Sequence, residues 1–275
     1  MMDIIQRNLF RVLRSGAFNS NEKLEPMSAF KWESLYQLAA MHDVVPFAYR
    51  GLLNCRDQFH LRLSDKHWKE WETAANKSKG QDMNEEEDEF LRPDHLTNPL
   101  LNTKLQNILD DEHSDVTTRH LLLLFISIVR HILNEGMPIR QLLELGIYLR
   151  QEGKKVDFET LEKWISSLNL SQMCQLEGQC LILLYGFQAE EMPFIQDKKD
   201  KRIEAIAQEL LEFTNTRSQD WYFSQEADSI FVHNSNTSAM FSHVRRSARY
   251  FRYFPSESLT NFFASFVHSL SHIEE

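Results

Sequence analysis

Apolar side chains recur at steps of three and four residues along most of this 275-residue chain, and almost no segment alternates apolar with polar residues. A period of about 3.6 residues places such side chains on one face of an α-helix. The last stretch is the most regular, with Leu259, Phe262, Phe263, Phe266, Val267, Leu270 and Ile273 on one side. Ser229–His233 has a strand-like composition, but one strand cannot form a sheet alone. The sequence therefore predicts an all-α fold, an irregular multi-helix bundle with at most a minor strand pair.

Local signals predict where several helices begin and end. Asn98-Pro99 pairs a capping side chain with a first-turn proline, and Asp157 precedes another amphipathic segment. A long helix is expected over Val116–Asn134. Two short helices are expected within Trp32–Leu53, with Asp43 as the cap of the second.

The charge distribution divides the chain into three parts. Residues 82–89 contain six acids and no base, which is typical of a solvated linker. Consecutive carboxylates on a helix point in all directions, so this stretch is not expected to hold a cation. The predicted organisation is an N-terminal helical segment (residues 1–60), a variable, acidic, partly disordered connection (61–97) and a C-terminal helical domain (98–275).

Overall composition indicates a soluble cytoplasmic protein. The net charge of −10 disfavours nucleic acid as a partner. Three cysteines cannot all pair, and their spacing fits no common zinc pattern, so reduced thiols are expected. The longest apolar run, Leu121–Val129, is far shorter than the ~20 residues of a transmembrane helix, and the N-terminus does not resemble a signal peptide.

Sequence motifs of catalysis are absent. The chain has no Gly-x-Ser-x-Gly, phosphate-loop, dinucleotide-binding or His-Glu-x-x-His pattern, and no Asp-x-Asp pair that could hold magnesium. His268 and His272 lie four residues apart near the C-terminus and are interpreted as surface histidines. No catalytic residue, metal site or cofactor is therefore predicted.

The first candidate binding site brackets the sequence Gly136–Pro138, between two expected helices. Its residues are Arg130, His131, Glu135, Arg140, Gln141 and Glu144. Arg140 and Glu144 are four residues apart and could form a surface ion pair. Alternatively, the group forms a polar notch that holds an anionic ligand.

The second candidate is a basic and aromatic stretch, residues 240–254. Arg245, Arg249 and Arg252 share one helical face, and aromatic residues lie between them. This face could bind an acidic protein surface, anionic lipid or phosphates. In the alternative interpretation the aromatic rings pack inward and the arginines stack on tyrosines.

Four stretches together resemble a bacterial family of uncharacterised, polymerase-beta-like nucleotidyltransferases. Residues 130–149 resemble the helical segment that follows the catalytic palm of that family. Trp32–Leu53 is similar to its N-terminal helical pair, residues 98–102 to the segment just after the palm, and residues 245–255 to its basic-aromatic C-terminal helix. The resemblance covers most of the chain.

The family's catalytic palm has no counterpart in this sequence. The palm carries a Lys-Gly turn and an Arg-x-x-Gly-Asp-x-Asp strand that binds metal and triphosphate. Only residues 54–97 occupy its place, and Arg92-Pro93-Asp94 is the nearest match. Glu144 and Leu145 also stand where the family usually has Asp-Trp. No family catalytic residue can therefore be assigned here.

The resemblance implies a catalytically inactive, palm-deleted pseudoenzyme that acts as a helical binding or regulatory protein. Its expected partner is a protein, with a full-length nucleotidyltransferase as one such partner. Two alternatives stay open. One is an active nucleotidyltransferase that uses the carboxylates of Glu85–Glu89 and Asp110–Glu112; the other is a small-ligand-binding module built on the Arg130–Glu144 notch.

Overall fold

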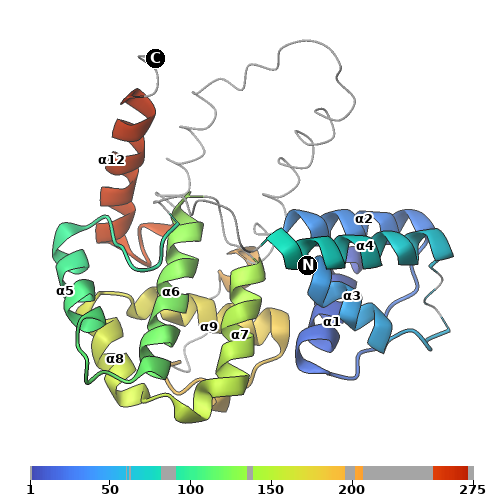
Figure 1. Ribbon diagram of the computed structural model, residues 1–275, viewed down its shortest axis with the longest axis horizontal. Helices are drawn as coiled ribbons and strands as arrows, with labels where there is room; N and C mark the ends of the chain where they lie inside the picture. The colour runs from blue at the N-terminus through green and yellow to red at the C-terminus, as the bar shows by residue number, and fades with distance from the viewer. Residues whose placement is uncertain are drawn as a thin grey trace. The chain divides into compact units, whose positions relative to one another are not determined.

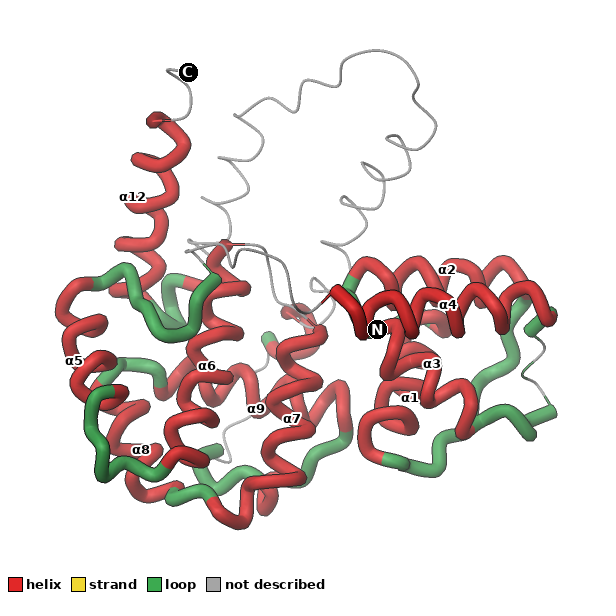
Figure 2. Tube along the Cα trace, in the orientation of Figure 1, coloured by secondary structure: helices red, strands yellow, loops and turns green. Residues whose placement is uncertain are grey.

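The computed structural model describes residues 2–59, 61, 63–81, 91–134, 139–195, 202–206 and 250–271, with the side chains of 78–81 and 265–271 outside the description. Helices make up 72% of the interpretable part, which contains no strand (Figure 2). The predicted all-α fold is confirmed. Ser229–His233, the acidic stretch 82–89 and Arg245 and Arg249 lie outside the described residues.

The chain divides into two compact units. The first contains the described parts of residues 1–86, 180–187 and 201–226, and the second those of residues 87–179, 188–200 and 227–275. In the first unit, α1 (Ile4–Phe18), α2 (Ala29–Met41), α3 (Val45–Asn54) and α4 (Asp65–Gln81) follow one another, and α2 and α4 run side by side (Figure 1).

Two glycines allow a close crossing of α1 and α3 in the first unit. A Cβ added to Gly16 of α1 would collide with the carbonyl oxygen of Phe47, and one added to Gly51 of α3 with that of Val12. Both glycines are buried. Backbone therefore packs on backbone where α1 meets α3, and no larger side chain fits there.

The second unit is built around α6 (Val116–Asn134). Ten residues of this helix are buried, among them Leu122, Phe125 and Val129. The other α-helices are α5 (Pro99–Leu109), α7 (Ile139–Glu152), α8 (Phe158–Ser167), α9 (Ser171–Tyr185, whose last residues from Cys180 belong to the first unit) and α12 (Pro255–Ser271). Short 3-10 turns occur at Gly153–Lys155 and Ala189–Glu191.

By length and composition α6 is the one helix of the described chain that could cross a membrane. It lies instead at the centre of the second unit, with Leu121, Ile126 and Ile132 fully buried. A helix that is apolar on most sides is expected at such a central position. We therefore interpret α6 as a core helix.

The predicted helix starts are mostly confirmed. The Asn98 side chain accepts hydrogen bonds from the backbone N–H groups of Leu100 and Leu101, and Asp157 caps α8. Asp43 as the cap of α3 was wrong. Its backbone is left-handed (φ 51°), and Val44 takes the capping position without a side-chain hydrogen bond. Asp tolerates this conformation better than most residues, so it serves the tight turn instead.

Candidate functional site

In the first turns of helix α12 of the second unit, where side chains are described, three polar side chains are buried and two large apolar side chains are exposed. Glu257, Ser258 and Asn261 are no more than 1% exposed, whereas Leu259 and Phe263 are 49% and 55% exposed. The helix extends away from the body of its unit after its first turns (Figure 1). An amphipathic helix ordinarily turns its apolar stripe towards a core, so this orientation requires a cause.

The cause is a buried ion pair. The Arg130 Nη1 of α6 lies 3.2 Å from the Glu257 Oε1 of α12, and the two side chains are 1% and 0% exposed. Glu257 also accepts hydrogen bonds from the backbone N–H groups of Thr97 (2.6 Å) and Asn98 (2.9 Å). Burying these two charges requires that they be paired and hydrogen-bonded, and Glu257 on the polar side of α12 meets this requirement for Arg130.

Further hydrogen bonds continue along the same interface. Asn261 accepts from Arg130 (3.3 Å) and donates its amide to the Asn134 side chain (3.0 Å). The hydroxyl groups of Thr97 and Thr260 lie 2.9 Å apart. The inner side of the first turns of α12 is thus matched to polar groups of the second unit, and Leu259 and Phe263 face outward.

Glu135 of the first candidate cluster lies outside the described residues, and the other members are divided among separate pairs. Arg130 points to Glu257, whereas His131 contacts Gln141, with His131 Nε2 and Gln141 Nε2 2.9 Å apart. The His131 Nδ1 lies 3.0 Å from the Ser127 carbonyl oxygen. These partners assign Nδ1–H as the donor and Nε2 as the acceptor. The expected ion pair between Arg140 and Glu144 is present at 2.9 Å.

Of the three arginines of the second candidate site, Arg252 alone is described, and its side chain is exposed. Of the aromatic residues described beside it, Tyr250, Tyr253 and Phe254 are buried, whereas Phe251 is 48% exposed. The carboxylates of the enzymatic alternative, Asp110–Glu112, are exposed at the end of α5; Glu85–Glu89 lie outside the described residues.

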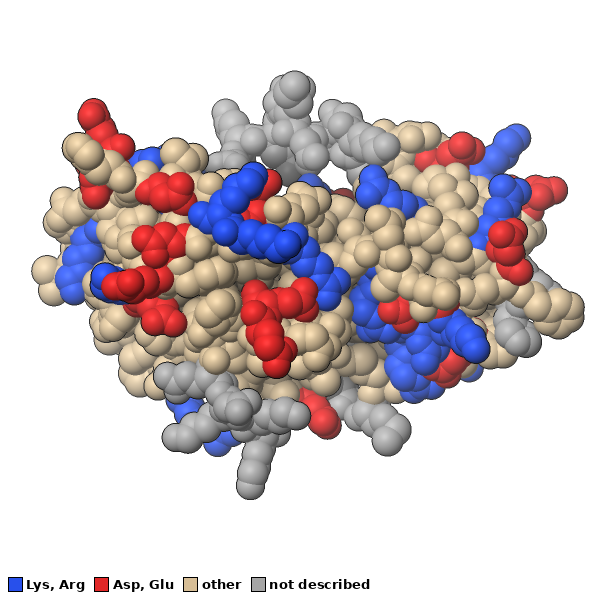
Figure 3. All heavy atoms as spheres, turned by 90° about the horizontal axis from the view of Figure 1, so that it is seen from below, with Lys and Arg blue, Asp and Glu red and all other residues tan. Residues whose placement is uncertain are grey.

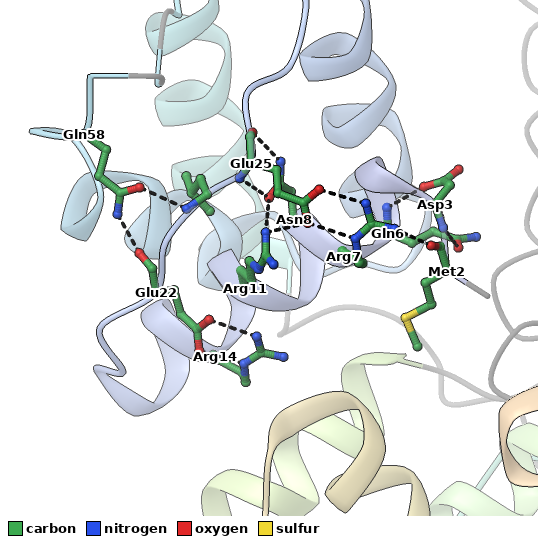
Figure 4. A network of polar contacts seen from close by, with 11 residues as sticks. Met2, Asp3, Gln6, Arg7, Asn8, Arg11, Arg14, Glu22, Glu25 and Gln58 are labelled. Carbon is green, nitrogen blue, oxygen red and sulfur yellow. Dashed lines mark hydrogen bonds and ion pairs between the residues drawn. The ribbon is translucent and has the colours of Figure 1, made fainter.

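A polar network of the first unit was missed by sequence reasoning. Arg7 donates two hydrogen bonds of 2.8 Å to Glu25, and Arg11 Nη1 lies 2.7 Å from the same carboxylate (Figure 4). Arg14 pairs with Glu22 at 2.7 Å. The three arginines share a face of α1 at steps of four and three, a signal that the sequence already contained.

This network holds the segment after α1 against that helix. Asn8 contributes as well, since its side chain donates to the Glu25 carbonyl oxygen and accepts from the Glu25 N–H. Basic and acidic side chains also interleave on the face shown in Figure 3. We interpret the network as structural because each of its three arginines is paired with Glu25 or Glu22.

No protein-family model matches the chain, and neither a curated protein nor a solved structure does. The resemblance to nucleotidyltransferases therefore stays a prediction. The outward apolar side of α12 is the feature of the second unit that calls for a functional explanation, because exposed apolar surface of this kind marks interaction sites.

Proposed function

We propose that the chain is a helical binding protein and that α12 is its docking helix. The observation that supports this proposal is the orientation of α12, with Glu257 buried against Arg130 and with Leu259 and Phe263 exposed. The Arg130–Glu257 pair fixes the helix in that orientation before any partner binds. A preformed docking helix loses little conformational entropy on association.

The apolar positions of α12 have the spacing of a coiled-coil seam. Leu259, Phe263, Phe266 and Leu270 follow one another in the sequence at steps of four, three and four residues. This heptad spacing places side chains in the holes of a facing helix. The expected partner surface is therefore another apolar helix, not a flat or charged surface.

We further propose that the facing helix belongs to a second copy of the chain. Glu257 is the one Asp, Glu, Lys or Arg of α12, and it is already paired with Arg130. Two copies of α12 can thus approach without like-charge repulsion, although each chain carries a net charge of −10. A full-length nucleotidyltransferase, the partner suggested by resemblance, would need an equally apolar helix.

The molecular mass in solution tests this proposal. Light scattering over a micromolar concentration series should give a dimer for the wild type and a monomer for the double variant Leu259→Glu, Phe263→Glu, with the same helical circular dichroism. Leu100→Glu is the matched control, because Leu100 of α5 is an exposed leucine (78%) of the same unit. A monomeric wild type, or a dimer that the double variant retains, would refute self-pairing.

We also propose a cytoplasmic location and no nucleotidyl transfer. The three cysteines, Cys55, Cys174 and Cys180, are buried and unbridged, which supports a reducing compartment. The exposed carboxylates of Asp110 and Asp111 do not offer the rigid, converging geometry that metal-assisted transfer requires.

A further inference from the structure

Three potential metal ligands converge between α2 and α4 of the first unit. Glu33 comes from α2, and His67 and Glu70 come from successive turns of α4. One ligand atom of each residue lies within 4.8 Å of the other two, and all three residues are half-buried. The His67 Nε2 is 3.8 Å from the Glu33 Oε2.

The imidazole of His67 is oriented by Ser64, the residue before α4. The Ser64 Oγ lies 3.0 Å from the His67 Nδ1 and also accepts the backbone N–H of His67 at 3.3 Å. In the tautomer whose Nδ1–H donates to Ser64, the Nε2 lone pair faces the carboxylates. Histidines that bind metals are held in this way by a partner on the other ring nitrogen.

The surroundings of the cluster are negative and partly apolar. Burial, and then the charges of Glu70 and Glu33, raise the pKa of the Tyr36 hydroxyl. The Tyr36 ring meets the buried Trp71 edge-on, with the two ring centroids 5.0 Å apart. Lys66 reaches Glu70 at 3.6 Å, but its side chain is 83% exposed and neutralises little of this charge.

We propose that Glu33, His67 and Glu70 bind one divalent transition-metal ion, with Zn²⁺ as the best-matched species. One imidazole and two carboxylates form a donor set that suits such ions. Side-chain rotation would bring the three atoms to the ~2.0–2.2 Å that zinc requires, and water would complete the coordination. The ion would link α2 to α4 and stabilise the first unit.

Calorimetric titration of the full-length chain with zinc chloride tests the site. We expect each chain to bind one zinc ion with micromolar affinity. The single variant His67→Gln and the double variant Glu33→Gln, Glu70→Gln should each bind zinc at least about tenfold more weakly. His113→Gln is the matched control. His113 is an exposed histidine that lies 3.7 Å from the single carboxylate of Asp111, whereas His67 lies beside two carboxylates, so this variant should bind zinc as the wild type does. Glu72→Gln is the control for charge on α4, since Glu72 is exposed and outside the cluster.

Thermal unfolding gives a second readout. At a hundredfold excess of free zinc over Kd, the unfolding midpoint of the wild type should rise by about 5 °C or more, and that of His67→Gln should not. Cobalt bound at the same site should give visible absorption that zinc displaces. Binding no tighter than millimolar, or micromolar binding that the ligand variants retain, would overturn the proposal.

Discussion

Arg130 and Glu257 are 127 positions apart in the sequence, yet their charged groups meet 3.2 Å apart in the interior of the second unit. The pair joins α6 to α12 and determines which side of α12 is buried. A charge that is withdrawn from water must be paired. The need to pair Arg130 therefore decides which side of α12 is buried, although the apolar pattern of the helix favours the opposite side.

Replacing Arg130 with methionine should therefore be costly. Glu257 would remain buried with its backbone donors but without a cation, and we expect a loss of about 3–5 kcal/mol of unfolding free energy. Chemical denaturation measures this loss. The control is Arg140→Met, which removes a partly exposed ion pair and should cost less than about 1 kcal/mol. Equal losses in the two variants would contradict the role given to Arg130.

The crossing of α1 and α3 should not accept a methyl group at Gly51. The added Cβ would collide with the carbonyl oxygen of Val12, which belongs to a helix and cannot move independently. We expect Gly51→Ala to destabilise the first unit by about 1–3 kcal/mol or more. Gly153→Ala meets no atom within 4 Å and should be tolerated. Similar denaturation midpoints for the two variants would refute the close crossing.

Glu25 should make the first unit sensitive to acid. Hydrogen bonds from Arg7, together with the charge of Arg11, lower the pKa of Glu25 from 4.5 to about 2, although partial desolvation acts to raise it. Because the folded pKa is the lower one, the stabilisation is present above pH 4.5 and is lost as the pH falls towards 2. A series of unfolding measurements at acid pH should show this loss in the wild type and less of it in Glu25→Gln. Identical pH dependences would disprove the prediction.

Glu177 of α9 should be uncharged in the folded protein. It is fully buried, neither carboxyl oxygen has a hydrogen-bond partner among the described residues, and burial raises its pKa well above 4.5. A raised folded pKa means that stability falls as the pH rises from 4.5 towards that pKa. Glu177→Met should remove this fall and stabilise the protein at neutral pH by about 1–3 kcal/mol.

The control for Glu177 is Glu162→Met, an exposed glutamate of α8. The unfolding free energy of Glu162→Met should change with pH in the same way as that of the wild type. If Glu177→Met unfolds more readily than the wild type at neutral pH, the carboxyl group has a stabilising partner and the prediction fails.

Nucleotide binding should be negligible. The exposed carboxylates of Asp110 and Asp111 are not held for metal binding; Asp111 instead accepts the backbone N–H of His113 at 3.0 Å. Calorimetric titration with nucleoside triphosphates and magnesium should show no affinity tighter than about 1 mM, near −4 kcal/mol. Micromolar affinity abolished by Asp110→Ala with Asp111→Ala would restore the enzymatic alternative.

The sequence alone determined several of the helices and many of their ends, although α4 (Asp65–Gln81) lies in the part expected to be a variable connection. Period and capping act within a few residues, so Asn98, Asp157 and the bounds of α6 could be inferred without any tertiary contact. The pair Arg140–Glu144 was accessible for the same reason, since one turn of helix separates the two residues.

Tertiary structure alone decided which of these helices meet and which side each one buries. No local pattern connects Arg130 with Glu257 or Glu33 with His67, because the residues of each pair lie on different helices. The apolar stripe of α12 is plain in the sequence, but its outward direction depends on a charge in α6 that has to be neutralised. Desolvating an unpaired charge costs more free energy than exposing a leucine and a phenylalanine, so the distant ion pair prevails over the local pattern.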